Sequence, residues 1–272
     1  MNSPLPSLIE PAQLEAVLGD PELLIVDLSQ PQTYARLHVP GALHVNPAAL
    51  VCGLPPAPGK LPSPAQLRAL FSGIGYRADR HVVIYDDEGG GWAGRFAWTL
   101  EVIGHHRYSL LDGGLHSWVK ERHPCESRAN TATPSPVELV LHPDVIAELS
   151  TVLAALGDPA TKIWDARSRE EYLGLRSGSL RAGHIPGAVN LDWLELMDPA
   201  RNLRLKPLPT LRAQLDALGI HPGHTIITHC QSHHRSGLTW FAAKLLGFKA
   251  LGYHGSWAEW GNHPDVPIET TV

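Results

Sequence analysis

The chain has 272 residues, of which 43% are hydrophobic and 18% are charged, and it carries a net charge of -5 with a pI near 6.3. This composition is typical of a globular protein rich in turns and excludes disordered and fibrous classes. A net negative charge offers no broad basic surface, so we expect no nucleic-acid partner. No apolar stretch approaches the roughly 18 residues of a membrane-spanning helix, and the first residues lack the pattern of a secretory signal. We therefore expect a soluble, cytoplasmic protein with no membrane partner.

The predicted elements occur in the same order twice along the chain. The first copy has a strand at 23–28 that contains Asp27, a His-x-Pro-Gly-Ala turn, a strand at 81–85, a helix at 93–103, a strand at 108–111 and a Gly-Trp turn at 113–118. The second copy has a strand at 162–166 that contains Asp165, the same turn, a strand at 225–229, a helix at 236–246, a strand at 250–253 and a Gly-Trp turn at 255–260. Strands that alternate with helices at this spacing predict a parallel sheet covered by helices on both faces.

Two copies of this pattern predict an α/β fold with two domains. The stretch 120–137 is polar, rich in Ser, Thr and Pro, and has no helical or strand period, which indicates a linker. The predicted division is a first domain over 1–120, a linker over 121–137 and a second domain over 138–272. In each His-x-Pro-Gly-Ala turn the proline fixes φ and the glycine permits the turn, so we predict structural corners at His38 and His184.

Three cysteines, Cys52, Cys125 and Cys230, lie far apart and form no CxxC pair. Their odd number argues against a disulfide scaffold and for a reducing compartment. Cys125 falls in the predicted linker, and Cys52 precedes a Pro-rich run at 54–64 that we predict to be a surface loop. Neither has the surroundings that activate a thiol, so Cys230 is the cysteine with a predicted role.

The turn after the strands at 81–85 and 225–229 differs most between the copies. In the first copy Asp86 begins a turn of three acids and three glycines, which we expect to repel anions. In the second copy Cys230 stands at the same position and begins the turn Cys-Gln-Ser-His-His-Arg-Ser. In a doubly wound sheet, ligands bind outside the carboxyl ends of the strands, where a turn leading into a helix directs N–H groups at one point. These donors and the helix dipole lower a thiol pKa, so we predict that Cys230 is a nucleophile.

The rest of this turn predicts an anion-binding loop. Arg235, at its far end, is placed to present a forked donor to an oxyanion. The serines offer hydroxyl groups, and the histidines offer partial positive charge. The residues assigned to substrate binding are Arg235, Gln231, Ser232, His233, His234 and Ser236.

In combination, these motifs resemble the tandem-domain rhodaneses, which are thiosulfate:cyanide sulfurtransferases. The resemblance covers nearly the whole chain and rests on the two strand aspartates, the two His-x-Pro-Gly-Ala turns, the Gly-Trp turns and the loop from Cys230 to Arg235. The family has an inactive N-terminal copy with an acid in place of the cysteine, which matches Asp86. Within the family, the loop looks most similar to the bacterial form with paired histidines, Cys-Gln-Ser-His-His-Arg.

The resemblance implies two rhodanese-like domains, each a parallel sheet with helices on both faces. It implies that sulfane sulfur moves from thiosulfate to cyanide or another thiophilic acceptor, such as a dithiol, through a persulfide on Cys230. This chemistry requires no metal and no organic cofactor, and nothing in it calls for more than a monomer.

Some positions depart from the family pattern. Many members with thiosulfate activity have basic residues directly after the cysteine, where this chain has Gln231 and Ser232. Many members also carry an arginine after the second strand aspartate, where this chain has Glu171. Members that use 3-mercaptopyruvate have a small Gly/Ser-rich loop, which differs from this one. We keep 3-mercaptopyruvate as an alternative donor.

Three other functions stay open for this loop. A cysteine phosphatase or arsenate reductase has a longer loop, whereas only four residues separate Cys230 from Arg235, a gap that suits a sulfur atom better than a phosphate. A metal site made from Cys230 and the neighbouring histidines would crowd four ligands on one turn, whereas structural zinc sites draw on separate pairs. A carrier that delivers persulfide sulfur to a partner protein would need the same residues as the enzyme.

Overall fold

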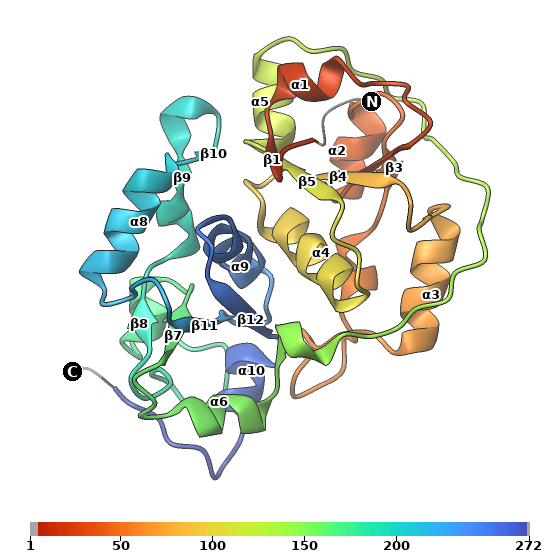
Figure 1. The fold of residues 1–272 in the computed structure, drawn as a ribbon. Coiled ribbons are helices and arrows are strands. Elements are labelled where there is room, and N and C mark those ends of the chain that lie inside the picture. The colour runs from red at the N-terminus through yellow and green to blue at the C-terminus, as the bar shows by residue number, and fades with distance from the viewer. Residues whose placement is uncertain (1–4, 271–272) are drawn as a thin grey trace. The chain divides into compact units, whose positions relative to one another are not determined.

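Residues 5–270 are described by the computed structural model of the protein, drawn as a ribbon in Figure 1. They form two compact units. The first contains the chain up to Leu50, Pro62–Leu141 and Asp198–Leu205, and the second contains Val51–Leu61, His142–Met197 and the chain from Lys206 onward. Each copy of the repeat provides the frame of one unit, and each contributes one short segment to the other unit.

The first unit is built on a parallel sheet of five strands in the order β1-β5-β4-β2-β3. Its strands are β1 (Leu8–Ile9), β2 (Leu23–Asp27), β3 (Leu43–His44), β4 (His81–Tyr85) and β5 (Tyr108–Leu111). In β2 and β4 nearly every side chain is buried, and many are β-branched. Strands that are apolar on both faces need cover on both faces.

Helices provide this cover in the first unit. They are α1 (Pro11–Glu15), α2 (Pro31–Arg36), α3 (Pro64–Gly73), α4 (Gly91–Val102) and α5 (Gly114–Lys120), with a 3-10 turn η1 (Pro47–Leu50). Leu14 of α1 and Trp118 of α5 pack with Tyr85 of β4 in one core. Side chains alternate along a strand, so the neighbouring Ile84, which is buried, faces the side of the sheet opposite Tyr85. Helix α4 contacts β4 and covers the face of the sheet opposite α1 and α5 (Figure 1).

The second unit repeats this architecture, with a parallel sheet in the order β6-β12-β11-β7-β8. Its strands are β6 (Ile146–Ala147), β7 (Thr161–Asp165), β8 (Val189–Asn190), β11 (Thr225–His229) and β12 (Lys249–Tyr253). Its helices are α6 (Leu149–Ala155), α7 (Arg169–Tyr172), α8 (Leu208–Ala217), α9 (Arg235–Leu245) and α10 (Ser256–Trp260). Val152 of α6 and Trp257 of α10 pack with Ile227 of β11, and α9 contacts β11 and β12.

The remaining elements are short. They are the 3-10 turns η2 (Pro143–Val145), η3 (Trp193–Leu196) and η4 (Pro199–Arg201), and the two-stranded sheet of β9 (Met197–Asp198) and β10 (Arg204–Leu205).

The α/β fold predicted from the repeat is confirmed. The strands predicted at 81–85 and 225–229 are β4 and β11, with the same bounds. Helices α4 and α9 begin one or two residues earlier than predicted. Both end before a glycine with positive φ, Gly104 at 74° and Gly247 at 82°, as the C-cap pattern predicts.

The two His-x-Pro-Gly-Ala turns are structural corners, as predicted. His38 Nδ1 lies 2.7 Å from the Tyr34 carbonyl oxygen, and His184 Nδ1 lies 2.8 Å from that of Tyr172. Each buried imidazole also stacks on its tyrosine, with ring centroids 3.9 and 3.8 Å apart. These tyrosine–histidine pairs are therefore equivalent positions in the two copies.

The stretch predicted as a linker, 121–137, has almost no regular secondary structure. Glu126 within it forms a backbone bridge with His38, and the stretch is counted with the first unit. Between residues 5 and 270, no helix is long and apolar enough to cross a membrane.

Candidate active site

Cys230 is the first residue after β11, the middle strand of the second sheet, and so it lies at the carboxyl ends of the strands. Its N–H donates to Ser256 Oγ at 3.3 Å, and its carbonyl oxygen accepts from the Trp257 N–H at 2.9 Å. The side chain is only 1% exposed. The first turn of α10 thus fixes the backbone from which the thiol projects.

The surroundings of the Cys230 sulfur favour the thiolate. Burial by itself raises the pKa of Cys230, but the charge of Arg235, the hydroxyl and N–H of Ser236 and the nearby His234 lower it, so that the net pKa lies below the ordinary thiol value. Ser236 belongs to the first turn of α9, where N–H groups have no partner within the helix. The thiolate is the reactive form of a cysteine nucleophile.

His233 holds the turn in shape. Its φ of 57° lies in the left-handed region, and its side chain is buried. Its Nδ1 lies 2.8 Å from Ser236 Oγ. When Nδ1 donates to this oxygen, the Ser236 hydroxyl keeps its own hydrogen for the Cys230 sulfur. In that tautomer, His233 supports the Ser236 hydroxyl group, which lowers the pKa of Cys230.

Arg235 forms a bidentate ion pair with Glu171. Arg235 Nη1 lies 2.6 Å from Glu171 Oε2, and Nη2 lies 2.9 Å from Oε1. Burial by itself raises the pKa of Glu171, but its bonds and charge interaction with Arg235 bring the net pKa below the ordinary value. The guanidinium group of Arg235, which we predict to face an oxyanion, is thus bound by Glu171 of α7. Glu171 stands at the position where the family resemblance leads us to expect an arginine.

The other residues of the loop face different surroundings. Gln231 Nε2 lies 3.2 Å from Ser179 Oγ and 3.4 Å from the Gly178 carbonyl oxygen, so its amide is directed toward that segment. The His234 ring lies beside Trp193, with centroids 5.9 Å apart. Among the loop side chains, those of Arg235, Ser236 and His234 influence the sulfur, whereas the Gln231 amide is bonded elsewhere.

A segment from the first copy packs against this turn. A Cβ atom at Gly59 would lie 2.2 Å from the carbonyl oxygen of Ser232. Any side chain here would collide with backbone, so glycine is required for this close approach. The prediction of a surface loop at 54–64 is therefore wrong for Ala57, Gly59 and Pro62, which are buried. It was based on local composition, which carries no information on packing against a distant segment.

The residues after Gly59 anchor this segment. Lys60 Nζ lies 2.7 Å from Glu259 and 3.2 Å from Glu148, and the Leu61 N–H donates to His254 Nδ1 at 3.2 Å. Sequence reasoning missed all of these contacts, because the partners lie far along the chain. A glycine inside a Pro-rich run was the one local hint of a close backbone approach.

In the first unit Asp86 takes the place of Cys230. Its Oδ1 accepts the N–H groups of residues 88–90 at 2.8 to 3.1 Å, and its Oδ2 accepts the Ala93 N–H at 2.9 Å. We expected this turn to repel anions. The turn is a cradle of N–H groups filled by its own carboxylate, so these donors are not free for a substrate, and the repulsion of anions stays a prediction.

Metal-binding geometry is lacking over the described part of the chain, where no group of three or more His, Cys, Asp or Glu residues is arranged to hold an ion. The histidines around Cys230 have other contacts. His229 Nε2 lies 3.7 Å from Asp165, and His233 is bonded to Ser236.

Both copies of the repeat match one known protein family. A model of the Rhodanese-like domain matches the chain twice, over residues 10–121 and 148–263. The thiosulfate sulfurtransferase of Azotobacter vinelandii is 49% identical over 266 residues, which cover 97% of this chain and 97% of that protein. The thiosulfate sulfurtransferase of Pseudomonas aeruginosa is 47% identical over 268 residues, which cover 98% of each.

A solved structure agrees with this grouping. SseA from Escherichia coli, described as a 3-mercaptopyruvate sulfotransferase of rhodanese fold, matches with a TM-score of 0.83 at 28% identity. The match covers 92% of this chain and 98% of SseA, and so includes both sheets. With two domain matches and two nearly full-length relatives, the chain belongs to the rhodanese family and carries two rhodanese-like domains in tandem.

Proposed function

We propose that this protein is a thiosulfate sulfurtransferase that moves sulfane sulfur to cyanide or another thiophilic acceptor through a persulfide on Cys230. The observation that carries the proposal is a buried thiol beside the first turn of α9, whose pKa is lowered by Arg235 and Ser236 against the effect of burial. Two relatives at 49% and 47% identity bear the name of this activity, whereas the mercaptopyruvate-type structure shares 28%.

The reaction consists of two displacements on sulfur. In the first, the Cys230 thiolate attacks the outer sulfur of thiosulfate, the S–S bond of thiosulfate breaks, and sulfite leaves with the electron pair. In the second, cyanide or a thiolate attacks the outer sulfur of the persulfide, and the electron pair of the broken S–S bond returns to Cys230. With cyanide the product is thiocyanate. No outside oxidant or reductant is needed.

The loop residues stabilise the thiolate of Cys230 and then its persulfide, the two anionic forms of the cysteine in the reaction. Ser236 donates its hydroxyl and N–H to the thiolate, and His233 orients that hydroxyl. Because Glu171 holds its guanidinium, Arg235 acts as a fixed positive charge rather than as a free fork. The rest of the Cys-Gln-Ser-His-His-Arg loop, Gln231, Ser232 and His234, would line the substrate site with them.

The two domains would have different roles. The first, over 1–120, is inactive in this proposal because Asp86 replaces the thiol and fills its own turn. The second, over 138–272 after a linker at 121–137, carries the activity. A monomer is sufficient for this mechanism, and a reducing cytoplasm would keep Cys230 available between turnovers.

Mass spectrometry tests the persulfide directly. After incubation with thiosulfate and removal of excess donor, the peptide that contains Cys230 should gain about 32 Da, the mass of one sulfur atom. Addition of cyanide should remove this mass and release thiocyanate. Cys230→Ser should show neither effect, whereas Cys125→Ser should show both. A protein that forms no adduct at Cys230 contradicts the mechanism.

Donor and acceptor comparisons separate the proposal from its alternatives. We expect a higher kcat/KM with thiosulfate than with 3-mercaptopyruvate, and the reverse ranking would assign the alternative donor. A persulfide that passes to protein thiols but not to cyanide would indicate a carrier. Hydrolysis of an aryl phosphate would point to a phosphatase.

A further inference from the structure

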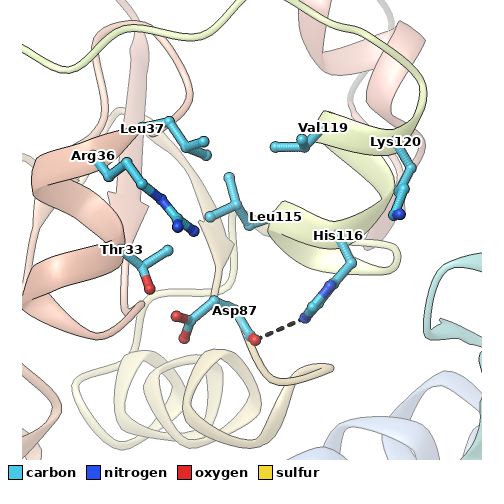
Figure 2. Close-up of a pocket in the computed structure, with 8 residues that line it drawn as sticks. All are labelled: Thr33, Arg36, Leu37, Asp87, Leu115, His116, Val119 and Lys120. Atoms are coloured by element: carbon cyan, nitrogen blue, oxygen red, sulfur yellow. Dashed lines mark hydrogen bonds between the residues drawn. The ribbon is translucent and has the colours of Figure 1, made fainter.

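The first unit contains a cavity of about 240 Å³ between α2 and α5 (Figure 2). Its lining residues come from these two helices and from the turn that begins at Asp86. They are Thr33, Arg36, Leu37, Asp87, Leu115, His116, Val119 and Lys120. Figure 2 shows the apolar side chains of Leu115 and Val119 on α5 facing Leu37, with Arg36 on α2 and Lys120 on α5 at the rim.

The rim of this cavity carries unbalanced positive charge. The side chains of Arg36 and Lys120 are exposed, and within residues 5–270 neither has an ion-pair or hydrogen-bond partner. The one carboxylate in the lining, Asp87, accepts the Gln30 N–H at 3.2 Å, and His116 Nε2 lies 2.8 Å from the Asp87 carbonyl oxygen. The cavity thus combines an apolar floor with two cations that have no partner among residues 5–270, and the Asp87 carboxylate offsets the charge of only one of them.

A difference in length between the two copies accounts for this cavity in the first unit. In the first copy, three residues of the chain separate Tyr34 from His38. In the second copy, eleven residues separate the equivalent Tyr172 and His184. The second copy therefore has an insertion of eight residues where the first copy passes directly from α2 to its corner.

The inserted residues pack onto a defined surface of the second unit. The Gln231 Nε2 lies 3.2 Å from Ser179 Oγ, and the Trp257 Nε1–H donates to Ser177 Oγ at 3.4 Å. The Arg181 N–H donates to the Gly261 carbonyl oxygen at 2.9 Å. The Leu180 N–H donates to Asn262 Oδ1 at 2.8 Å. A short polypeptide segment thus covers one residue of the turn that begins at Cys230, one residue in the first turn of α10 and the two residues that follow α10.

These four residues correspond to four that line the cavity of the first unit. Aligning Asp86 with Cys230 pairs Asp87 with Gln231, and aligning the Gly-Trp turns pairs Leu115 with Trp257. The same alignment pairs Val119 with Gly261 and Lys120 with Asn262. The surface that the second copy covers with its own chain is the surface that the first copy leaves open.

We propose that this cavity is a docking site for a short acidic segment of a partner protein, which takes the place that residues 177–181 occupy in the second copy. The internal precedent shows that the surface accepts extended polypeptide. The acidic preference follows from the charge change at one position: Asn262 accepts an N–H from the insertion, whereas Lys120 cannot accept one and attracts a carboxylate. Arg36 adds a second cation, and Leu115 and Val119 receive an apolar side chain.

Two matched peptides test the proposal in the full-length protein. One is the heptapeptide of residues 176–182, Arg-Ser-Gly-Ser-Leu-Arg-Ala, and the other replaces both arginines with glutamate. Each carries an N-terminal fluorophore for fluorescence anisotropy. The acidic peptide should bind at least about tenfold more tightly than the basic one, and this preference should weaken as salt is raised. An acidic peptide with Ser in place of Leu should also bind more weakly, because it leaves the apolar floor uncovered.

Charge reversal distinguishes this site from general attraction to the surface. In Arg36→Glu/Lys120→Glu the preference should invert, so that the basic peptide binds more tightly. The matched control Arg68→Glu/Arg107→Glu reverses two cations of the same unit that lie outside the cavity lining, and it should keep the wild-type preference. Sulfur transfer from thiosulfate should be unchanged in both variants and reports correct folding. No saturable binding of the acidic peptide at millimolar concentration, or an unchanged preference in the Arg36/Lys120 variant, overturns the proposal.

Discussion

At the scale of single residues, the ion pair of Arg235 with Glu171 sets the charge near Cys230, the proposed nucleophile. The charge of the guanidinium group lowers the pKa of Cys230, and the same group forms an ion pair with a carboxylate at 2.6 Å. The Arg235 side chain is 21% exposed and that of Glu171 is 10% exposed, so solvent and salt screen this pair less than a surface pair. The reactivity of the thiol therefore depends on the balance between two opposed charges.

Arg235→Gln should make Cys230 less reactive at neutral pH. The positive charge of Arg235 lowers the pKa of Cys230, so its removal should move the midpoint of the alkylation profile to higher pH. A smaller thiolate fraction at pH 7 should slow alkylation by iodoacetamide about tenfold. The measurement is the rate of modification of the Cys230 peptide as a function of pH, followed by mass spectrometry.

Two further variants serve as controls for this effect. Arg235→Lys keeps the charge and should retain most of the reactivity, although it loses the bidentate geometry. Glu171→Gln leaves the charge of Arg235 unopposed and should move the midpoint in the opposite direction, to lower pH. An identical profile in wild type and Arg235→Gln would show that the arginine charge does not control the thiol.

At the scale of elements, the segment Val51–Leu61 contacts the turn that begins at Cys230, although it comes from the first copy of the repeat. Gly59 lies against the Ser232 backbone, and Lys60 joins this contact to Glu148 and Glu259. Because the contact is backbone against backbone, neither side can yield by rotating a side chain. The segment therefore positions the turn rather than taking part in the chemistry.

Gly59→Ala should lower kcat for sulfur transfer by about a hundredfold, because a displacement of the turn by about 1 Å misaligns the attacking sulfur. It should also raise the midpoint of the Cys230 alkylation profile, since the Ser236 donors would no longer face the sulfur. Steady-state kinetics with thiosulfate and cyanide and the alkylation assay measure the two effects.

Gly73→Ala is the matched control. Its added Cβ meets no atom within 4 Å, and wild-type kinetics are expected. A melting temperature for Gly59→Ala close to that of wild type would separate local misalignment from unfolding. If Gly59→Ala turns over like wild type, the positioning role is refuted.

At the scale of the whole molecule, each copy of the repeat depends on a segment of the other copy. Val51–Leu61 is part of the second unit, and Asp198–Leu205 is part of the first. In the first unit Arg204 lies 2.8 Å from Glu10 and 2.6 Å from Glu121, and the Leu205 N–H donates to Asp112. Each unit therefore includes one short segment that belongs, in sequence, to the other copy of the repeat.

The fragment of residues 138–272 should therefore be a poor enzyme. It retains Cys230 and Arg235 but lacks Gly59 and Lys60, so its turn loses an outside support. We expect kcat at least about tenfold below that of the full chain, with a lower melting temperature, measured by steady-state kinetics and circular dichroism. A folded fragment with the activity of the full chain would show that the first copy is dispensable for catalysis.

Much of the fold, and the choice of Cys230 as the proposed nucleophile, followed from local sequence patterns. Apolar runs with β-branched residues predicted the strands β4 and β11, and glycines predicted where the helices α4 and α9 end. The contrast between Asp86 and Cys230 needed only an alignment of the two copies. These features depend on neighbouring residues, whose conformational preferences act over a few positions.

Other features depended on which distant segments the fold brings together. The sequence by itself determined the repeat, the strand–turn–helix that carries Cys230 and the loop that ends at Arg235. The tertiary structure decided that Glu171 holds Arg235, that Gly59 supports the turn and that the counterpart of the second-copy insertion is an open cavity. The physical reason is that such contacts join residues far apart in the chain, so no local preference encodes them and they form only when the sheets and helices pack.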